Sequence, residues 1–236
     1  MVRRPVPSNR IKKIFLASNS QGTSAGIPRE LNYPSQLQSM LGKDFDVHRM
    51  LISGWTLRDF VKTVPDNVLP LNPDFVVMNF GIIEASQRIL SNWEKKFLSL
   101  VPGGPRVTGM LHRNRARVLM LRHSLGLATR QETVMDYSAS VRDAADCLVE
   151  KNIKYLFLKI PTFQDQGKTL GNPYINNDIE LFNSALDEYP SLLFESFEGG
   201  WSMSDFQDGT VHFSVAGQRK IAENIKSYIM DKLVEQ

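Results

Sequence analysis

The 236-residue sequence contains a single cysteine, Cys147, and no long apolar run. One thiol excludes an internal disulfide and a cysteine-rich zinc site, and it is typical of proteins from a reducing compartment. Because no stretch reaches about 18 consecutive apolar residues, we expect no membrane-spanning helix. The basic, proline-bearing segment 1–10 lacks the apolar core of a secretory signal, which favours a cytoplasmic protein.

An excess of charge of either sign is also absent. The 28 Lys and Arg residues nearly balance the 25 Asp and Glu residues, which leaves a formal net charge of +3. This balance gives no electrostatic reason to expect nucleic-acid binding. The sequence also shows no motif for a metal or an organic cofactor, so we expect neither. With 42% apolar residues, the chain has the composition of one globular domain over 1–236.

Short apolar runs alternate with helical patterns along the chain. Strands are expected at residues 13–17, 45–51, 74–80, 153–160 and 192–195. Helices are expected from about residue 33, at 56–61, at 176–189 and at 215–234. This alternation indicates right-handed crossovers, so the sequence predicts an α/β protein with three α/β/α layers and a parallel sheet of about five strands.

Helical periodicity also dominates from residue 92 to about 151, with breaks at Pro102 and near Gly126. We expect residues 89–135 to form a helical cap inserted into the domain. The stretch 106–130 is basic and contains no acidic residue. It is typical of a cap helix with arginines in water, of a peripheral contact with an anionic membrane, or of a cover over an anionic substrate. We favour the cap, with recognition of a phosphate or carboxylate as its candidate role. The residues expected to pack on the domain are Val118, Leu119, Leu121 and Leu125.

Small and polar residues stand where the predicted strands end. Ser20 follows the first strand, Gly54 the second and Gly81 the third, while Asp208 and His212 precede the last helix. Ligands of parallel α/β sheets bind beyond the carboxyl ends of the strands. We therefore expect these loops to form a site at one edge of the sheet.

In their order, these segments resemble the four blocks of the SGNH/GDSL hydrolases. Residues 18–20 (Ser-Asn-Ser) stand where that family has Gly-Asp-Ser, and Gly54 stands for its lone glycine. Residues 81–84 (Gly-Ile-Ile-Glu) stand for Gly-x-Asn-Asp, and 208–212 for Asp-x-x-His with one extra residue. The resemblance spans nearly the whole chain outside the helical insertion, and it implies the flavodoxin-like fold of that family.

The resemblance also implies roles for individual residues. Ser20 would be the nucleophile, His212 its base, and Asp208 the group that orients the imidazole. The amides of Ser20 and Gly54 would form the oxyanion hole. The remaining expected substrate contacts are Asn19, Asn79, Gly81, Glu84 and Arg88.

One departure from the family pattern concerns the oxyanion hole, because Ile83 occupies the position of the family's asparagine. Losing one such donor costs on the order of 3 kcal/mol, or about a hundredfold in rate. Asn79 and Asn19 are candidate replacements. Glu84 replaces the next aspartate, and Arg88, four residues on, would pair with it or bind an anionic substrate. This block is similar to SGNH proteins associated with surface-polysaccharide biosynthesis.

The resemblance therefore predicts a cofactor-independent esterase that cleaves an O-acyl ester, in the first instance O-acetyl, of a carbohydrate-type substrate. Two alternatives stay open: an O-acyltransferase acting on a polysaccharide precursor, and a binding protein that has kept the fold with weakened catalysis. A purely structural explanation also exists for each residue. Ser20 can cap a helix, residues 208–209 (Asp-Gly) form a common turn, and Gly54 and Gly81 can serve backbone conformation alone.

Overall fold

The computed structural model describes residues 10–23, 26–163, 172–197, 200–207 and 211–234. In these ranges five strands form one parallel sheet in the order β2-β1-β3-β6-β7. The strands are β1 (Lys12–Ser18), β2 (Phe45–Leu51), β3 (Phe75–Asn79), β6 (Lys154–Leu158) and β7 (Ser191–Leu192). All five residues of β3 are buried, as expected for a central strand of a parallel sheet covered on both faces.

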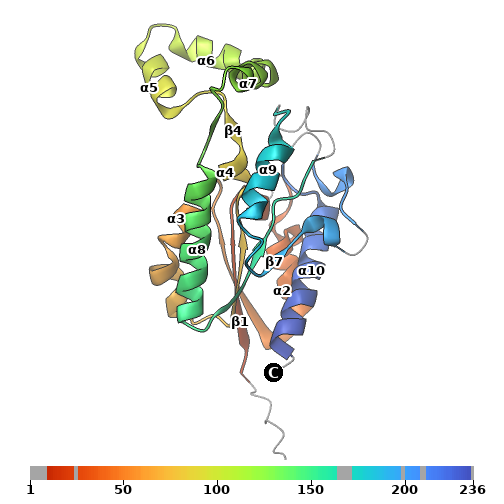
Figure 1. The fold of residues 1–236 in the computed structure, drawn as a ribbon. Coiled ribbons are helices and arrows are strands. Elements are labelled where there is room, and N and C mark those ends of the chain that lie inside the picture. Colours follow the sequence, from red (N-terminus) through yellow and green to blue (C-terminus); the bar gives the residue numbers. More distant parts are fainter. Residues whose placement is uncertain (1–9, 24–25, 164–171, 198–199, 208–210, 235–236) are drawn as a thin grey trace, which may run out of the picture.

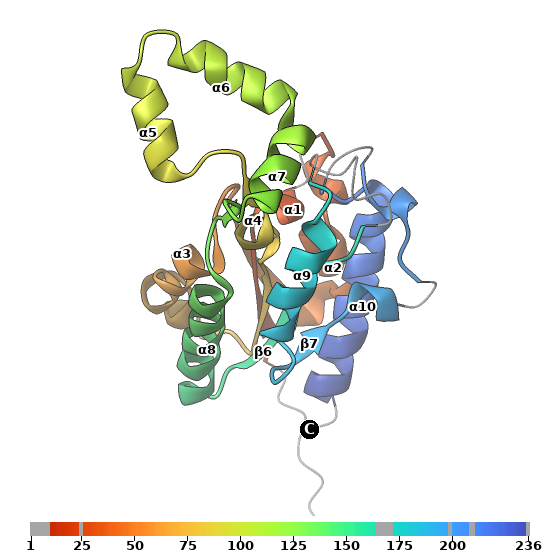
Figure 2. The same cartoon turned by 45° about the horizontal axis from the view of Figure 1, so that its top comes forward.

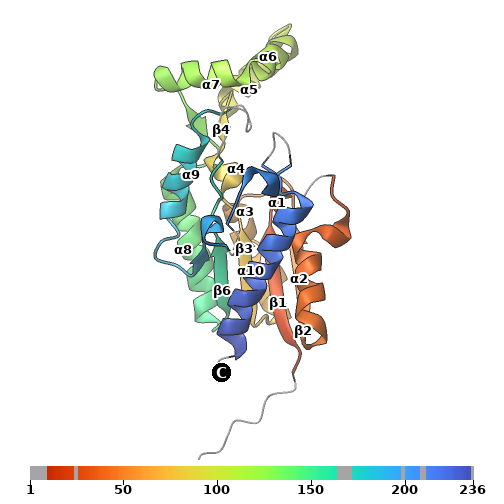
Figure 3. The same ribbon diagram turned by 90° about the vertical axis from the view of Figure 1, so that its right-hand side faces the viewer.

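Helices cover both faces of this sheet, which confirms the predicted three-layer fold (Figure 1). On one face, α2 (Tyr33–Leu41) packs against α10 (Val215–Val234). On the other face lie α3 (Leu57–Val61), α8 (Val134–Glu150) and α9 (Ile175–Ser184). Figure 3 shows the two layers on opposite sides of the strands.

Short helical turns connect these elements. Two of them, α1 (Ser20–Thr23) and α4 (Ile82–Ala85), follow β1 and β3 directly. The others are η1 (Arg29–Leu31), η2 (Gly42–Asp44), the π-helical turn η3 (Val64–Val68), η4 (Leu69–Leu71), η5 (Phe194–Ser196) and η6 (Met203–Asp205). The strand predicted at 192–195 is shorter than expected, because the chain turns into η5 and buries Phe194 against Trp201 and Phe213.

The helical insertion is carried on a small ribbon that the sequence pattern does not predict. Strand β4 (Gln87–Arg88) pairs antiparallel with β5 (Thr129–Arg130). Between them lie α5 (Asn92–Leu100), α6 (Gly104–Arg113) and α7 (Arg115–Ser124). Figures 1 and 2 show these three helices projecting beyond the end of the sheet where α4 lies.

The predicted inward face of α7 is right for Val118 and Leu119, which belong to one apolar cluster, and wrong for the other two leucines. Leu119 is fully buried, but Leu121 and Leu125 are 60% and 61% exposed. Arg115 and Arg122 lie on the same side as Leu119, where they donate hydrogen bonds to a backbone carbonyl and a carboxylate. Residues three or four positions apart lie on the same face of a helix, so Arg115, Leu119 and Arg122 share the inward face. Leu121 and Leu125 therefore lie on the solvent side.

No helix in the described ranges is both long and apolar enough to cross a membrane. Nor do the described residues contain a group of three or more His, Cys, Asp or Glu side chains that is placed to hold a metal ion.

Candidate active site

The predicted nucleophile and the predicted oxyanion glycine lie on adjacent loops at the carboxyl edge of the sheet. Strand β1 ends at Ser18, and Ser20 is the first residue of α1. The backbone amide of Ile52, just after β2, donates a hydrogen bond of 3.0 Å to the carbonyl of Ser18. Gly54 follows with φ +84°, a conformation that favours glycine. The β2 loop is therefore held beside the segment that carries Ser20.

Two buried glutamines join this edge to the beginning of α10. The side chain of Gln21 donates from Nε2 to the carbonyl of Val211 over 3.1 Å. The side chain of Gln218 donates to the carbonyl of Gln21 over 3.1 Å and accepts from the amide of Tyr33 over 2.7 Å. Residues 190 or more positions apart in the sequence thus lie side by side.

This arrangement brings the segment that contains His212 next to the one that contains Ser20. Val211, which accepts the bond from Gln21, directly precedes His212. The carbonyl of His212 accepts a bond of 2.8 Å from the amide of Gln207, which holds the backbone of this loop, and the imidazole is half-buried. Asp208 lies outside the described residues, so its role stays a prediction.

A cavity of about 270 Å³ opens beside Ser20. Ser20 and Val211 line it from the body of the domain, and Ile83 presents an aliphatic side chain to it. The described residues that line it are Ser20, Ile82, Ile83, Ser86, Gln87, Arg88, Ile89, Leu90, Lys95, His112, Arg115, Gln131 and Val211. The predicted nucleophile therefore faces a space that a substrate can enter, and residues of the insertion form part of its wall.

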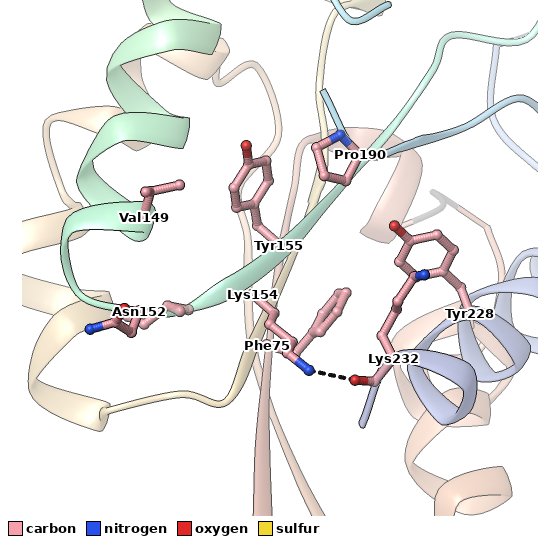
Figure 4. Close-up of a pocket in the computed structure, with 9 residues that line it drawn as sticks. Phe75, Val149, Asn152, Lys154, Tyr155, Pro190, Tyr228 and Lys232 are labelled. Atoms are coloured by element: carbon pink, nitrogen blue, oxygen red, sulfur yellow. Dashed lines mark hydrogen bonds between the residues drawn. The ribbon is translucent and has the colours of Figure 1, made fainter. Parts of the chain in front are cut away.

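A second cavity, of about 400 Å³, lies at the opposite edge of the sheet (Figure 4). Phe75 and Lys154, the first residues of β3 and β6, line it together with Tyr228 and Lys232 of α10. The Lys154 ammonium donates to the carbonyl of Lys232. Because ligands of such sheets bind at the carboxyl edge, we place the candidate active site at Ser20.

Three of the predicted substrate contacts are buried and do not line the cavity beside Ser20. The side-chain oxygen of Asn19 accepts from the backbone amide two residues on, which shapes the turn into α1. Asn79 is 1% exposed and lies near the hydroxyl of Tyr33, whose pKa burial raises to about 12. Gly81 has φ +110°, and Ile160 occupies the space that a Cβ would need. All three shape the edge of the sheet rather than the cavity wall.

Glu84 also has a structural task in place of the predicted substrate contact. Its fully buried carboxylate accepts from the amides of Leu57 over 2.6 Å and Gly81 over 2.9 Å. These bonds join the beginning of α3 to that of α4. Burial raises the pKa of Glu84 to about 7, and the nearby carboxylate of Glu132 adds to this effect, while the two amides oppose it.

Arg88 is the one residue of the predicted substrate-binding set that lines the cavity. The predicted ion pair between Arg88 and Glu84 is wrong. It would need both residues one turn apart on a helix, but α4 ends at Ala85 and Arg88 lies in β4. Its guanidinium instead donates to the side chain of Asn92 over 2.6 Å.

The sequence interpretation did not select three other basic residues of the lining: Lys95, His112 and Arg115. A signal for two of them was present, because His112 and Arg115 belong to the basic stretch 106–130. Gln21 and Gln218 gave no comparable signal, since a lone glutamine beside a motif has many possible roles.

No protein-family model matches the chain, and no curated protein matches its sequence. Solved structures do match. TesA superposes with a TM-score of 0.60 at 16% identity, over 94% of this chain and 100% of its own. A GDSL-like lipase from Bacteroides thetaiotaomicron gives 0.56 at 13% identity, over 98% of this chain and 93% of its own.

A catalytic mutant of Axe2, an acetylxylan esterase from Geobacillus stearothermophilus, gives a TM-score of 0.56 at 14% identity, over 93% of this chain and 94% of its own. The chain has the SGNH/GDSL hydrolase fold. At these identities the likeness establishes the SGNH fold alone, and lipase or esterase activity belongs to the proteins so named. The resemblance read from the sequence motifs is confirmed at this level.

The buried hydrogen bonds of Gln218 predict the effect of replacing this residue by methionine. The Gln218→Met change leaves the amide of Tyr33 and the carbonyl of Gln21 without these partners in a buried place, which costs about 2 to 4 kcal/mol of unfolding free energy. We also expect the labelling of Ser20 by a fluorophosphonate to slow by about tenfold or more, because small displacements of reacting groups are costly. Urea unfolding and labelling kinetics measure the two effects.

Gln38→Met is the matched control. Gln38 bridges α2 and β2 in the same way, donating to the carbonyl of Phe45 and accepting from the amide of Val47, at the beginning of β2 and so at the edge of the sheet opposite to the site. It should destabilise the fold yet leave the labelling rate of the folded protein unchanged. Equal labelling rates for Gln218→Met and Gln38→Met would contradict the positioning role.

The buried carboxylate of Glu84 predicts a pH-dependent stability. Its folded pKa of about 7 lies above the ordinary value of 4.5, so the folded state binds the proton more tightly. This contribution to stability is complete below about pH 4.5 and is lost as the pH rises through about 7. Since Glu84→Gln removes the titration, the unfolding free energy of the wild type relative to the variant should fall by roughly 2 to 3 kcal/mol over this range. Parallel stability curves in urea unfolding between pH 4.5 and 8 would contradict it.

Proposed function

We propose that this chain is a serine ester hydrolase that removes an O-acyl group, in the first instance O-acetyl, from a carbohydrate-type substrate. The observation that carries the proposal is the position of Ser20. It begins α1 at the carboxyl edge of the sheet, lines a cavity, and is followed by Gln21, which is bonded to the segment of His212. The SGNH fold, shared with an acetylxylan esterase among other ester hydrolases, supports an ester as substrate.

In the proposed reaction, the hydroxyl oxygen of Ser20 attacks the carbonyl carbon of the ester, and His212 accepts the hydroxyl proton. The carbonyl oxygen becomes an oxyanion, which the amides of Ser20 and Gly54 would stabilise. The carbon–oxygen bond to the sugar then breaks, and the leaving alkoxide takes the proton from His212. The acyl group remains on Ser20 as an ester.

Water completes the cycle. His212 removes a proton from a water molecule, whose oxygen attacks the acyl carbon. The tetrahedral intermediate releases Ser20, which recovers its proton from His212, and the free carboxylic acid departs. In this scheme Asp208 keeps the imidazole in the tautomer that faces Ser20 and stabilises the imidazolium. If a sugar hydroxyl replaces water in this step, the same site performs acyl transfer, and product analysis distinguishes the two.

Ile83 favours a second candidate function. Its aliphatic side chain lines the cavity where the SGNH pattern has an amide donor, so transition-state stabilisation by that donor is missing. A protein that binds an acylated sugar without efficient turnover fits this feature. Both candidate functions are compatible with a protein that has a single cysteine. Because one thiol is typical of a reducing compartment, we propose a cytoplasmic location for either function.

The proposal predicts that Ser20→Ala abolishes both fluorophosphonate labelling and hydrolysis of 4-nitrophenyl acetate. Ser86→Ala is the matched control, because Ser86 lines the same cavity but its hydroxyl donates to the carbonyl of Ile82. It should keep both activities within about threefold, and His212→Ala should lower turnover by about 1,000-fold or more. A wild-type protein that is neither labelled nor active would favour the binding function, and an active Ser20→Ala protein would overturn the mechanism.

Replacing Asp208 tests whether a carboxylate assists His212. We expect Asp208→Asn to lower kcat by about tenfold or more while leaving KM nearly unchanged. The reason is that the carboxylate assists the imidazole in the chemical step and takes no part in substrate binding. Steady-state kinetics with 4-nitrophenyl acetate measure the change. Wild-type kinetics in Asp208→Asn would replace the triad by a Ser-His dyad.

A further inference from the structure

The cavity beside Ser20 is surrounded by positive charge. Arg88 lines it from the ribbon, Lys95 from α5 and Arg115 from α7, with His112 at the end of α6. None of the aspartates or glutamates that the structure describes lines it. Its volume of about 270 Å³ lies near the lower end of the range for small-molecule sites, so it suits one small unit of a substrate.

The carboxylates that the structure describes do not neutralise this charge. Within the described part of the chain, Arg88, Lys95 and Arg115 form no ion pair. The nearby carboxylates are already committed elsewhere: Glu94 to Arg122 over 2.7 Å, and Asp178 to Arg130. A small cavity with several cations and no carboxylate among its described lining residues attracts a negatively charged ligand.

Arg115 is the most constrained of these cations. Its side chain is half-buried, and burial lowers the pKa of its guanidinium. One terminal nitrogen donates to the carbonyl of Gln87 over 2.8 Å, while the buried Nε has no hydrogen-bond partner among the described residues. A guanidinium carries five N–H donors in a rigid fork that matches the oxygens of a carboxylate or phosphate. Among the described residues, the carbonyl of Gln87 is the acceptor that this group has.

The ribbon that carries these residues is anchored to the body by a buried carboxylate. Asp178 of α9 is 2% exposed. It accepts two hydrogen bonds from the guanidinium of Arg130 on β5 and one of 2.8 Å from the side chain of Gln87 on β4. Because the carbonyl of Gln87 in turn holds Arg115, a fixed network links the basic side chain to the domain of Ser20.

We propose that this basic cavity is a binding subsite for a carboxylate or phosphate group carried by the acylated substrate. The inference rests on the proposed function and narrows it to acyl esters of an acidic unit, such as a uronic acid or a sugar phosphate. The Arg115 guanidinium binds two oxygens of the anion, Arg88 and Lys95 add charge, and the ester bond lies over Ser20. The subsite is built jointly by the sheet domain and the insertion.

Matched aryl acetates test this subsite. They are 4-acetoxybenzoate and 4-acetoxyphenyl phosphate, which are anionic, and methyl 4-acetoxybenzoate, which is neutral. The measured quantity is the ratio of kcat/KM for each anionic ester to that for the neutral ester. Arg115→Gln and Arg88→Gln should each lower this ratio by about tenfold or more, mostly through KM, because hydrogen bonds to charged groups are strong. The two anionic probes separate carboxylate recognition from phosphate recognition.

Arg113→Gln is the matched control, because Arg113 is exposed at the end of α6 and does not line the cavity. It should leave the ratio unchanged, and Arg115→Lys should restore it in part. An unchanged ratio in Arg115→Gln and Arg88→Gln overturns the subsite, as does an equal loss in Arg113→Gln. Circular dichroism checks folding, and Arg88→Gln carries the test if Arg115→Gln fails to fold.

Calorimetry separates failure of the subsite from failure of the proposed function. We expect 4-hydroxybenzoate to bind the wild type more tightly than methyl 4-hydroxybenzoate, and to lose this advantage in Arg115→Gln. Binding with this pattern but without turnover of any ester supports the subsite and refutes the hydrolase. Turnover without any preference for the anion refutes the subsite alone.

Discussion

The candidate site depends on buried amide hydrogen bonds that hold the two ends of the fold together. Gln21 and Gln218 are both nearly inaccessible to water, so each bond they make replaces one that solvent would otherwise supply. Their bonds connect the loop after the first strand, the beginning of α2 and the beginning of the last helix. Because these segments are distant in sequence, no local propensity can bring them together. Tertiary hydrogen bonding does so, at the edge where the serine meets the cavity.

A similar constraint, made by a buried charge in place of neutral amides, fixes the wall of the cavity that the insertion forms. Asp178 is buried in α9, where an unpaired carboxylate would be costly, and it is satisfied by Arg130 and Gln87 from the two strands of the ribbon. The ribbon thereby has a defined position on the body, and α7 is bonded to it through Arg115. The chemistry of the serine and the electrostatics of the cavity thus come from different parts of the chain, joined by few contacts.

Much of the sheet could be predicted from local pattern, since an apolar run such as 74–80 leaves little choice but a buried strand. The ribbon could not, because two-residue strands have no periodicity. The inward face of α7 was misassigned in part, for Leu121 and Leu125, for a different reason: apolar residues lie on both sides of that helix, and hydrogen bonds of two arginines decide which side faces inward. For Glu84, a polar side chain in a motif suggested a ligand contact, whereas its carboxylate satisfies backbone amides in the core.

The pairing of β4 with β5 has a consequence for how such a protein can diversify. Gln87 lies opposite Arg130, so the insertion leaves the body and returns to it at neighbouring points. Helices between these points can lengthen, shorten or be exchanged, because the two ends of the insertion stay at the same short distance from each other. Evolution can therefore exchange this module on an unaltered sheet domain, and each new module would present different side chains to the same cavity.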